Sequence, residues 1–246
     1  MGKGCRVKIG LVVNITMFAI IILLSGMYNA QYVRAMDLSV TPNIPITAGS
    51  ALLIEATSGK ILFQKEPDKP LPPASITKIM TMLLAMEHIE QGKIALSDMV
   101  IASERAMSMG GSQIWLEIGE EMSLEDMMKS IAIVSANDSS VAVAEHIAGS
   151  EELFVDMMNK RSHELGMTGT HFVNASGLPK ENHYTTARDI ALMSRELLKY
   201  PKVHEWFTTW IDYVRDGKNI LVNTNRLINS YDGVDGLKTG FTDEAG

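Results

Sequence analysis

Cysteine is almost absent from this sequence of 246 residues, with Cys5 as the single example. One thiol cannot close an intramolecular disulfide, so the fold must be stabilised by its apolar core. A zinc site is also poorly supported, because no cysteine or acidic cluster accompanies His171 and His183. The sequence holds no internal repeat and no low-complexity linker, and its length predicts one large domain or two small ones.

Acidic residues are missing from positions 1–35, which hold four basic residues instead. A basic start is followed by a mostly apolar stretch at 9–24, and Val-Arg-Ala at 33–35 fits the small-x-small rule of signal peptidase. We therefore expect a signal peptide over 1–35, cleaved after Ala35, and a chain exported to the outer side of the cytoplasmic membrane. The alternative is an uncleaved membrane anchor, because the apolar stretch is long for a signal peptide.

Basic residues are in deficit over the rest of the chain. The formal net charge is -7, and removal of 1–35 takes it to -11. An acidic chain repels phosphate backbones, so we expect no nucleic-acid partner. An apolar fraction of 46% with 21% charged residues is that of a globular protein and excludes a disordered chain.

Apolar periodicity predicts strands first, then a run of helices, then strand-like sequence again. Residues 50–55 and 61–64 read as a hairpin around a turn at 57–60, and the chain turns strand-like again from 219 to 240. Helices are predicted between these two strand-like regions, over 75–87, 125–137, 139–147, 153–165 and 187–200.

The first motif with chemical meaning is Ser75-Ile-Thr-Lys78, at the start of a buried helix. The i, i+3 spacing puts both side chains on one face, one turn apart. A serine hydroxyl needs a base to become a nucleophile, and a lysine in apolar surroundings can be neutral because desolvation lowers its pKa. The alternative, an N-capping serine and a solvated lysine, does not explain a lysine inside a wholly apolar run.

Two shorter motifs follow along the chain. Ser135-Ala-Asn137 offers a hydroxyl and a carboxamide two residues apart, although such a pair can equally satisfy local backbone at a helix end. Lys238-Thr239-Gly240, read as a strand, offers a cation, a hydroxyl and a glycine that lets substrate backbone approach, although a surface turn would have the same composition.

Ser-x-x-Lys, Ser-x-Asn and Lys-Thr-Gly each occur once, in that order, and the combination is specific where each motif alone is not. From about Ala48 onward the chain resembles the low-molecular-weight penicillin-binding proteins, the D-Ala-D-Ala carboxypeptidases of the S11 peptidase type. The resemblance extends to further stretches: 55–62, 72–75, 109–112, 174–178, 183–187 and 233–242.

The resemblance implies an α/β fold of the β-lactamase and DD-peptidase type, with an antiparallel sheet packed against a mainly helical subdomain. By the same resemblance the catalytic residues are Ser75 as nucleophile, Lys78 as its base and Ser135 as proton relay to the leaving D-alanine. Penicillin would leave a slowly hydrolysed ester on Ser75. No metal or other cofactor is expected.

The substrate-binding residues are likewise implied by the resemblance. Asn137 would hold the substrate amide, and Lys238, Thr239 and Gly240 would bind the end that carries the terminal carboxylate. The backbone N–H of Phe241 would complete an oxyanion hole with that of Ser75. The implied partners are peptidoglycan stem peptides and β-lactams, with the outer face of the cytoplasmic membrane as a possible contact.

Two alternatives remain at this stage. A class A β-lactamase would share the three motifs, but its Glu-x-x-Leu-Asn pattern is missing between Asn137 and Lys238. The other alternative is a truncated, inactive paralogue that binds without turning over a substrate. Relatives continue beyond the Lys-Thr-Gly strand, so we expect the catalytic domain, 36–246, to stop before its sheet is complete. Oligomeric state, carboxypeptidase or endopeptidase preference, and vegetative or sporulation role stay open.

Overall fold

The computed structural model describes residues 44–243 and 245, and the predicted signal peptide lies outside them. The chain divides into two compact units between Pro45 and Ile46, and every helix and strand described below belongs to the second unit. The mixture of helices and antiparallel strands in this unit confirms the predicted α/β class.

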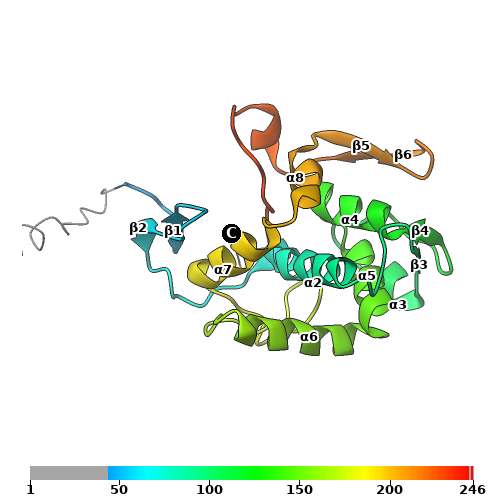
Figure 1. Ribbon diagram of the computed structural model, residues 1–246, viewed down its shortest axis with the longest axis horizontal. Helices are drawn as coiled ribbons and strands as arrows, with labels where there is room; N and C mark the ends of the chain where they lie inside the picture. The colour runs from blue at the N-terminus through cyan, green and yellow to red at the C-terminus, as the bar shows by residue number, and fades with distance from the viewer. Residues whose placement is uncertain (1–43, 244, 246) are drawn as a thin grey trace, which may run out of the picture. The chain divides into compact units, whose positions relative to one another are not determined.

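The strands form three separate two-stranded antiparallel sheets (Figure 1). The first is the predicted hairpin, in which Leu53 pairs with Phe63 and the register shifts after Leu53. The sheets are β1 (Ala51–Ile54) with β2 (Ile61–Lys65), β3 (Met99–Ile101) with β4 (Glu121–Ser123), and β5 (Ile211–Val214) with β6 (Asn219–Val222).

The expectation of a strand at Lys238-Thr239-Gly240 is not met. No strand pairs with this segment within the described part of the chain, and a strand exists only when a neighbour completes its hydrogen bonds. The strand-like sequence after Asn219 instead forms β6, which pairs with β5, a strand that the periodicity did not predict.

The helices begin where the sequence supplies caps. The side-chain oxygens of Ser103, Ser123, Ser150 and Thr186 each accept a hydrogen bond from the backbone N–H three residues on. The helical elements are η1 (Ala74–Thr77), α2 (Lys78–Glu90), α3 (Glu104–Met107), α4 (Leu124–Ile133), α5 (Asn137–Ala148), α6 (Glu151–Glu164), α7 (Ala187–Leu197), α8 (Pro201–Thr208) and η2 (Arg226–Asn229).

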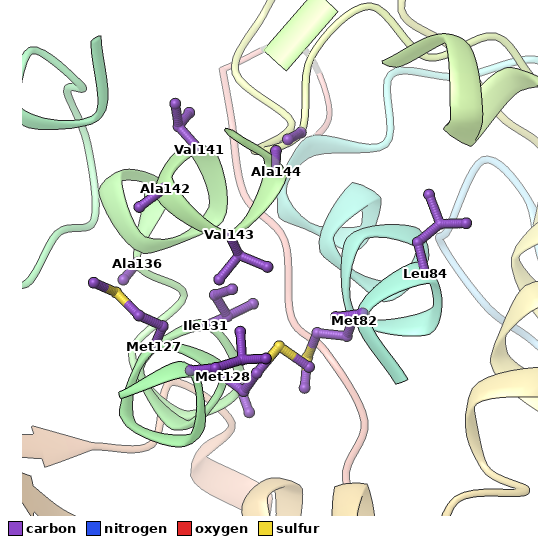
Figure 2. Packing of buried hydrophobic residues seen from close by; sticks show 14 of the residues in the cluster. Met82, Leu84, Met127, Met128, Ile131, Ala136, Val141, Ala142, Val143 and Ala144 are labelled. Atoms are coloured by element: carbon purple, nitrogen blue, oxygen red, sulfur yellow. The ribbon is translucent and has the colours of Figure 1, made fainter. Parts of the chain in front are cut away.

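Helix α2 is the central element and contacts α4, α5, α6 and α7 (Figure 1). Its residues from Lys78 to Met86 are all buried, as the run without charge from Ile79 to Met86 predicts. Figure 2 shows how side chains of α2, α4 and α5 meet: Met82, Met128, Ile131 and Val143 point into the same space. Methionine fills irregular gaps in such a core because its side chain is unbranched and flexible.

The two helices predicted over 125–137 and 139–147 correspond to α4 and α5, but the boundary between them lies earlier in the chain than predicted. Helix α4 ends at Ile133 and α5 starts at Asn137, with Ser135 between them in a left-handed conformation (φ 63°). A non-glycine residue at positive φ cannot continue a right-handed helix. The break therefore turns the chain at the second motif and puts Asn137 in the first turn of α5.

Candidate active site

The first motif forms the junction of η1 and α2. Ser75 lies in the 3₁₀ turn and Lys78 is the first residue of the α-helix. Lys78 is completely buried, and its Nζ lies 3.0 Å from Ser75 Oγ. The pair is therefore within hydrogen-bond reach, as a nucleophile and its base must be.

Two carbonyl oxygens hold the Lys78 amine from other parts of the chain. Its Nζ donates to Asn137 Oδ1 at 2.6 Å and to the backbone oxygen of Ser176 at 2.5 Å. The amide of Asn137 cannot be turned around, because its Nδ2 donates to the Gly110 backbone oxygen at 2.7 Å. Residues 59 and 98 positions away thus fix the base beside Ser75.

Burial lowers the pKa of Lys78 well below its ordinary value, because the charged form loses its hydration. The positive charge of Lys238 lowers it further, and the carboxylate of Asp138 acts in the opposite direction. The site therefore favours a neutral amine at position 78, which is the form that can accept a proton.

Ser135 is buried, with 4% of its surface exposed. Its Oγ meets no hydrogen-bond partner among the residues that the structure describes. Buried hydroxyls are nearly always satisfied, and backbone strain of this kind collects at functional sites. A strained residue with a free buried hydroxyl, two positions before Asn137, is suited to meet a bound molecule.

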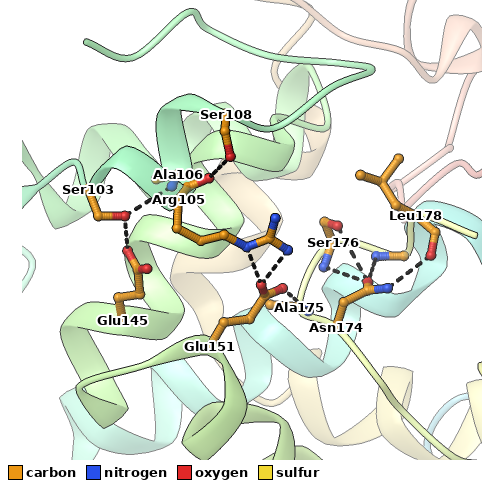
Figure 3. A network of polar contacts seen from close by, with 11 residues as sticks. Ser103, Arg105, Ala106, Ser108, Glu145, Glu151, Asn174, Ala175, Ser176 and Leu178 are labelled. Carbon is orange, nitrogen blue, oxygen red and sulfur yellow. Dashed lines mark hydrogen bonds and ion pairs between the residues drawn. The ribbon is translucent and has the colours of Figure 1, made fainter. Parts of the chain in front are cut away.

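A turn at 174–177 carries the Ser176 carbonyl toward Lys78. Figure 3 shows how it is held: Asn174 Oδ1 accepts from the backbone N–H groups of Ser176 (3.2 Å) and Gly177 (2.6 Å). Behind it, Glu151 Oε1 accepts from the Ala175 N–H at 3.1 Å. The role of this turn was missed from the sequence, because a backbone carbonyl leaves no residue signature.

The 174–177 turn also fits directly against residues 74–77, which carry the predicted nucleophile Ser75 and are called the nucleophile turn. A Cβ on Gly177 would lie 1.9 Å from the backbone oxygen of Ala74, so only glycine allows this approach. Ala74 itself has a positive φ of 47°, immediately before Ser75. The Ser75 backbone is thus fixed by packing as well as by its helix.

The third motif adjoins the same turn at Gly240, where a Cβ would lie 3.1 Å from Ile76 and 3.2 Å from the Pro73 backbone oxygen. Lys238 is 8% exposed, and burial lowers its pKa to about 8. Thr239 shares a 2.8 Å hydrogen bond with the hydroxyl of Thr224. The motif therefore brings a second amine near Lys78 and a hydroxyl beside it.

Phe241 is 74% exposed, and its backbone N–H donates to no group within the described residues. Both ring nitrogens of His183 are used in hydrogen bonds within the protein, Nε2 with Thr77 Oγ1 at 2.8 Å and Nδ1 with the Val173 N–H at 3.0 Å, so neither is free to bind a metal. In residues 44–243 and 245, no cluster of three or more metal-ligating side chains occurs.

No helix in the same residues has the length and apolar character needed to cross a membrane.

Sequence comparison matches residues 36–246 to the family described as peptidase S11, D-alanyl-D-alanine carboxypeptidase. The chain is 55% identical over 208 residues to the D-alanyl-D-alanine carboxypeptidase DacF of Bacillus subtilis, a match that covers 83% of this chain and 54% of DacF. It is 33% identical to DacA of Escherichia coli, with 87% and 55% of the two chains covered. The chain thus spans about half the length of the curated relatives it matches.

Solved structures give the same result for the fold. Penicillin-binding protein 5 of Haemophilus influenzae superposes with a TM-score of 0.79 at 35% identity, covering 84% of this chain and 61% of that one. The ampicillin-bound penicillin-binding protein D2 of Listeria monocytogenes superposes with a TM-score of 0.74 at 30% identity, covering 83% of each chain. These similarities fit the site geometry derived above.

Proposed function

The chain belongs to the peptidase S11 family of D-alanyl-D-alanine carboxypeptidases, and from that premise we propose that it removes the terminal D-alanine from peptidoglycan stem peptides. We further propose that it does so outside the cytoplasmic membrane, where that substrate lies, after export directed by residues 1–35 and with residues 36–246 as the catalytic domain. The 3.0 Å contact between Ser75 Oγ and the buried amine of Lys78 carries the proposal.

A neutral amine has two N–H donors and one lone pair. The two carbonyl oxygens of Asn137 and Ser176 can only accept, so they take the two N–H groups. The lone pair is then left for the Ser75 hydroxyl. Lowering of the Lys78 pKa by burial supports this assignment, because it favours the neutral form. Ser75 can therefore lose its proton to Lys78 as its oxygen attacks.

The proposed reaction is acyl transfer in two steps. The Ser75 oxygen forms a bond to the carbonyl carbon between the two D-alanines, and the C–N bond breaks. The proton of Ser75 passes to Lys78, and Ser135 relays a proton to the leaving amine of D-alanine. Water then hydrolyses the ester and frees Ser75. The buried, unpartnered hydroxyl of Ser135 supports its part in this relay.

Substrate binding is assigned to the second and third motifs. Asn137 would hold the substrate amide, while the charge of Lys238 and the hydroxyl of Thr239 would bind the terminal carboxylate. Gly240 lets the substrate backbone come close to the nucleophile turn. The backbone N–H groups of Ser75 and Phe241 would stabilise the oxyanion, and donors of this kind contribute about 3–4 kcal/mol each in other enzymes.

Covalent reaction with β-lactams follows from the same chemistry. The four-membered ring presents a carbonyl to Ser75, and its opening leaves an ester that deacylates slowly. The ampicillin-bound and cefotaxime-bound structures of the Listeria monocytogenes relative support a β-lactam as a ligand of this fold.

The test is labelling of the full chain with a fluorescent penicillin, followed by peptide mapping and by measurement of D-alanine released from a D-Ala-D-Ala peptide. We expect an adduct on Ser75 and release of D-alanine. Ser75→Ala should abolish both, and Lys78→Met should slow acylation by about 10²–10⁴-fold. An adduct on any other residue would overturn the proposal. Turnover of nitrocefin faster than D-alanine release would identify a β-lactamase instead.

A further inference from the structure

Trp115 is the most unusual residue outside the constellation described above. Its side chain is 72% exposed, although tryptophan is a residue that proteins usually bury. Its backbone is left-handed, with φ 61°, a conformation that is strained for a residue other than glycine. This strained conformation exposes a large aromatic ring to solvent, where the ring gains no stabilising contact in the free protein. Such an arrangement indicates a functional role for Trp115.

The backbone around Trp115 is held rigidly from two sides. The buried carboxylate of Asp138 accepts hydrogen bonds from the N–H groups of Ile114 and Leu116, each at 3.1 Å. Arg215 donates to the backbone oxygens of Ile114 (2.8 Å) and Trp115 (3.2 Å). The same guanidinium binds both carboxylate oxygens of Glu120, at 2.6 and 2.9 Å. The strained residue is therefore clamped and its ring is pre-organised.

The clamp connects this ring to the proposed active site. Asp138 directly follows Asn137, which binds the Lys78 amine. The backbone N–H of Asn137 donates to the Ser112 oxygen at 2.7 Å. Trp115 is three positions after Ser112, so at most about 11 Å of chain lies between their Cα atoms. Trp115 thus lies within reach of a large substrate that extends away from the site.

Trp115 also lines a hollow of about 410 Å³ together with Ile114, Glu117, Glu120, Arg215 and Asn219. The side chains of Glu117 and Asn219 make no hydrogen bond within the described part of the protein, whereas Arg215 and Glu120 satisfy each other. The hollow therefore combines an exposed aromatic face with a free carboxylate and a free amide. This is a surface for a ligand that has an apolar face and hydroxyl groups around its edge.

We propose that Trp115 is a stacking platform for a sugar ring of the glycan strand that carries the stem peptide. This inference rests on the proposed function, because that function supplies a peptide joined to a sugar. A pyranose has one apolar face of C–H groups and a rim of hydroxyls. The ring of Trp115 would cover the face, while Glu117 and Asn219 would bind the rim. A rigid tryptophan is suited to this, since little side-chain entropy is lost on binding.

The test compares two substrates of the full chain that differ only in the sugar: a disaccharide-linked pentapeptide and the same pentapeptide alone. We expect the sugar to lower KM about fivefold to tenfold. Trp115→Ala should remove that advantage and leave both the free pentapeptide and the rate of penicillin labelling unchanged. Trp115→Phe should keep most of the advantage. Leu153→Ala, which removes a side chain that is 55% exposed on α6, is the control and should change nothing.

A binding measurement separates this inference from the function on which it rests. The disaccharide without peptide should bind the Ser75→Ala chain, and the double variant Ser75→Ala/Trp115→Ala should not bind it. Binding by the first variant alone would support the platform even if neither peptide were hydrolysed. The proposal would be overturned if Trp115→Ala changed KM equally for both peptides or changed it for neither. If Trp115→Ala weakened binding of the chain to anionic vesicles and left KM for both peptides unchanged, Trp115 would be a membrane contact instead.

Discussion

His183 supports the nucleophile turn through Thr77, whose hydroxyl lies 2.8 Å from the imidazole Nε2. The other ring nitrogen, Nδ1, accepts a hydrogen bond from the Val173 backbone N–H at 3.0 Å. A nitrogen that accepts carries no proton, so Nε2 holds the proton and donates it to Thr77. The Val173 contact therefore requires the neutral ring, because a protonated Nδ1 cannot accept a hydrogen bond.

The neutral His183 ring predicts a loss of stability in acid. Burial, with smaller contributions from His171 and Lys180, lowers the pKa of His183 from 6.5 to about 4. Between these two values the unfolded chain binds a proton that the folded chain does not, so falling pH favours unfolding. The expected loss from pH 6.5 to 4 is on the order of 3 kcal/mol. Urea unfolding across this range should show a shallower decline for His183→Gln, and an equal decline in both chains would contradict the assignment.

Gly177 should tolerate no side chain. Gly177→Ala would put a Cβ 1.9 Å from the Ala74 oxygen, so the two turns must separate and Ser75 must move. Gly92→Ala is the matched control, because Gly92 also has a positive φ (67°) but faces open space. We expect about 1 kcal/mol of lost stability for Gly92→Ala and at least about 3 kcal/mol for Gly177→Ala.

Penicillin labelling distinguishes the two glycine variants further. The Gly177 variant should acylate slowly even where it is folded, while the Gly92 variant should react at the wild-type rate. Similar losses for both variants would show that backbone conformation alone, and not the contact with Ala74, decides the effect.

Glu151 should act on the site through the 174–177 turn. Glu151→Ala leaves the buried N–H of Ala175 without an acceptor, which costs about 1–3 kcal/mol, and it frees the turn that carries the Ser176 carbonyl. Glu151→Gln keeps a carbonyl for Ala175 and loses only the ion pair with Arg105, whose side chain is 54% exposed. That loss should be below about 1 kcal/mol.

Chemical denaturation measures the stability of Glu151→Ala and Glu151→Gln, and penicillin labelling measures their acylation rates. The alanine variant should show both lower stability and slower acylation, with the glutamine variant close to wild type in each. If glutamine were as harmful as alanine, the Arg105 ion pair and not the Ala175 hydrogen bond would be the important contact.

Binding of a peptide carboxylate should weaken in alkaline solution. Burial lowers the pKa of Lys238 to about 8, so the amine is charged below that pH and neutral above it. Only the charged form attracts a carboxylate, and KM for a D-Ala-D-Ala peptide should therefore rise as pH increases through about 8. Lys238→Arg remains charged throughout, so its KM should stay flat over pH 7–9. A rise of the same size in the arginine variant would exclude Lys238 as its cause.

Long apolar patterns were the part of the fold that the sequence predicted well. The uncharged run from Ile79 to Met86 predicts the buried helix α2, and α7 begins at Ala187, where the helix predicted over 187–200 begins. The boundary between α4 and α5 was predicted after residue 137 instead of at Ser135, because the apolar neighbours of Ser135 continue the helical pattern while a buried left-handed turn interrupts it. Strand β5 was missed because four residues beside a helix give too little periodicity.

Motif spacing indicated which residues gather, but it could not supply their geometry. Ser75, Lys78 and Asn137 come together as the motifs suggested, at hydrogen-bond distances from one amine. The Ser176 carbonyl completes that set and is invisible in a sequence, since every residue has one. No strand among residues 44–243 pairs with the segment around Lys238, which the sequence could not reveal because strand-like composition does not say whether a partner strand is adjacent.

The contacts of Lys78 with residues far along the sequence have a consequence for the chain before it folds. While the polypeptide is being synthesised, residue 78 is an ordinary hydrated, protonated lysine, and the serine three positions earlier is as unreactive as any other alcohol. Under the proposed mechanism, Ser75 becomes reactive only when segments 59 and 98 positions downstream close around the amine. The unfolded chain would then react with neither acyl compounds nor β-lactams, and folding itself would be the activation step.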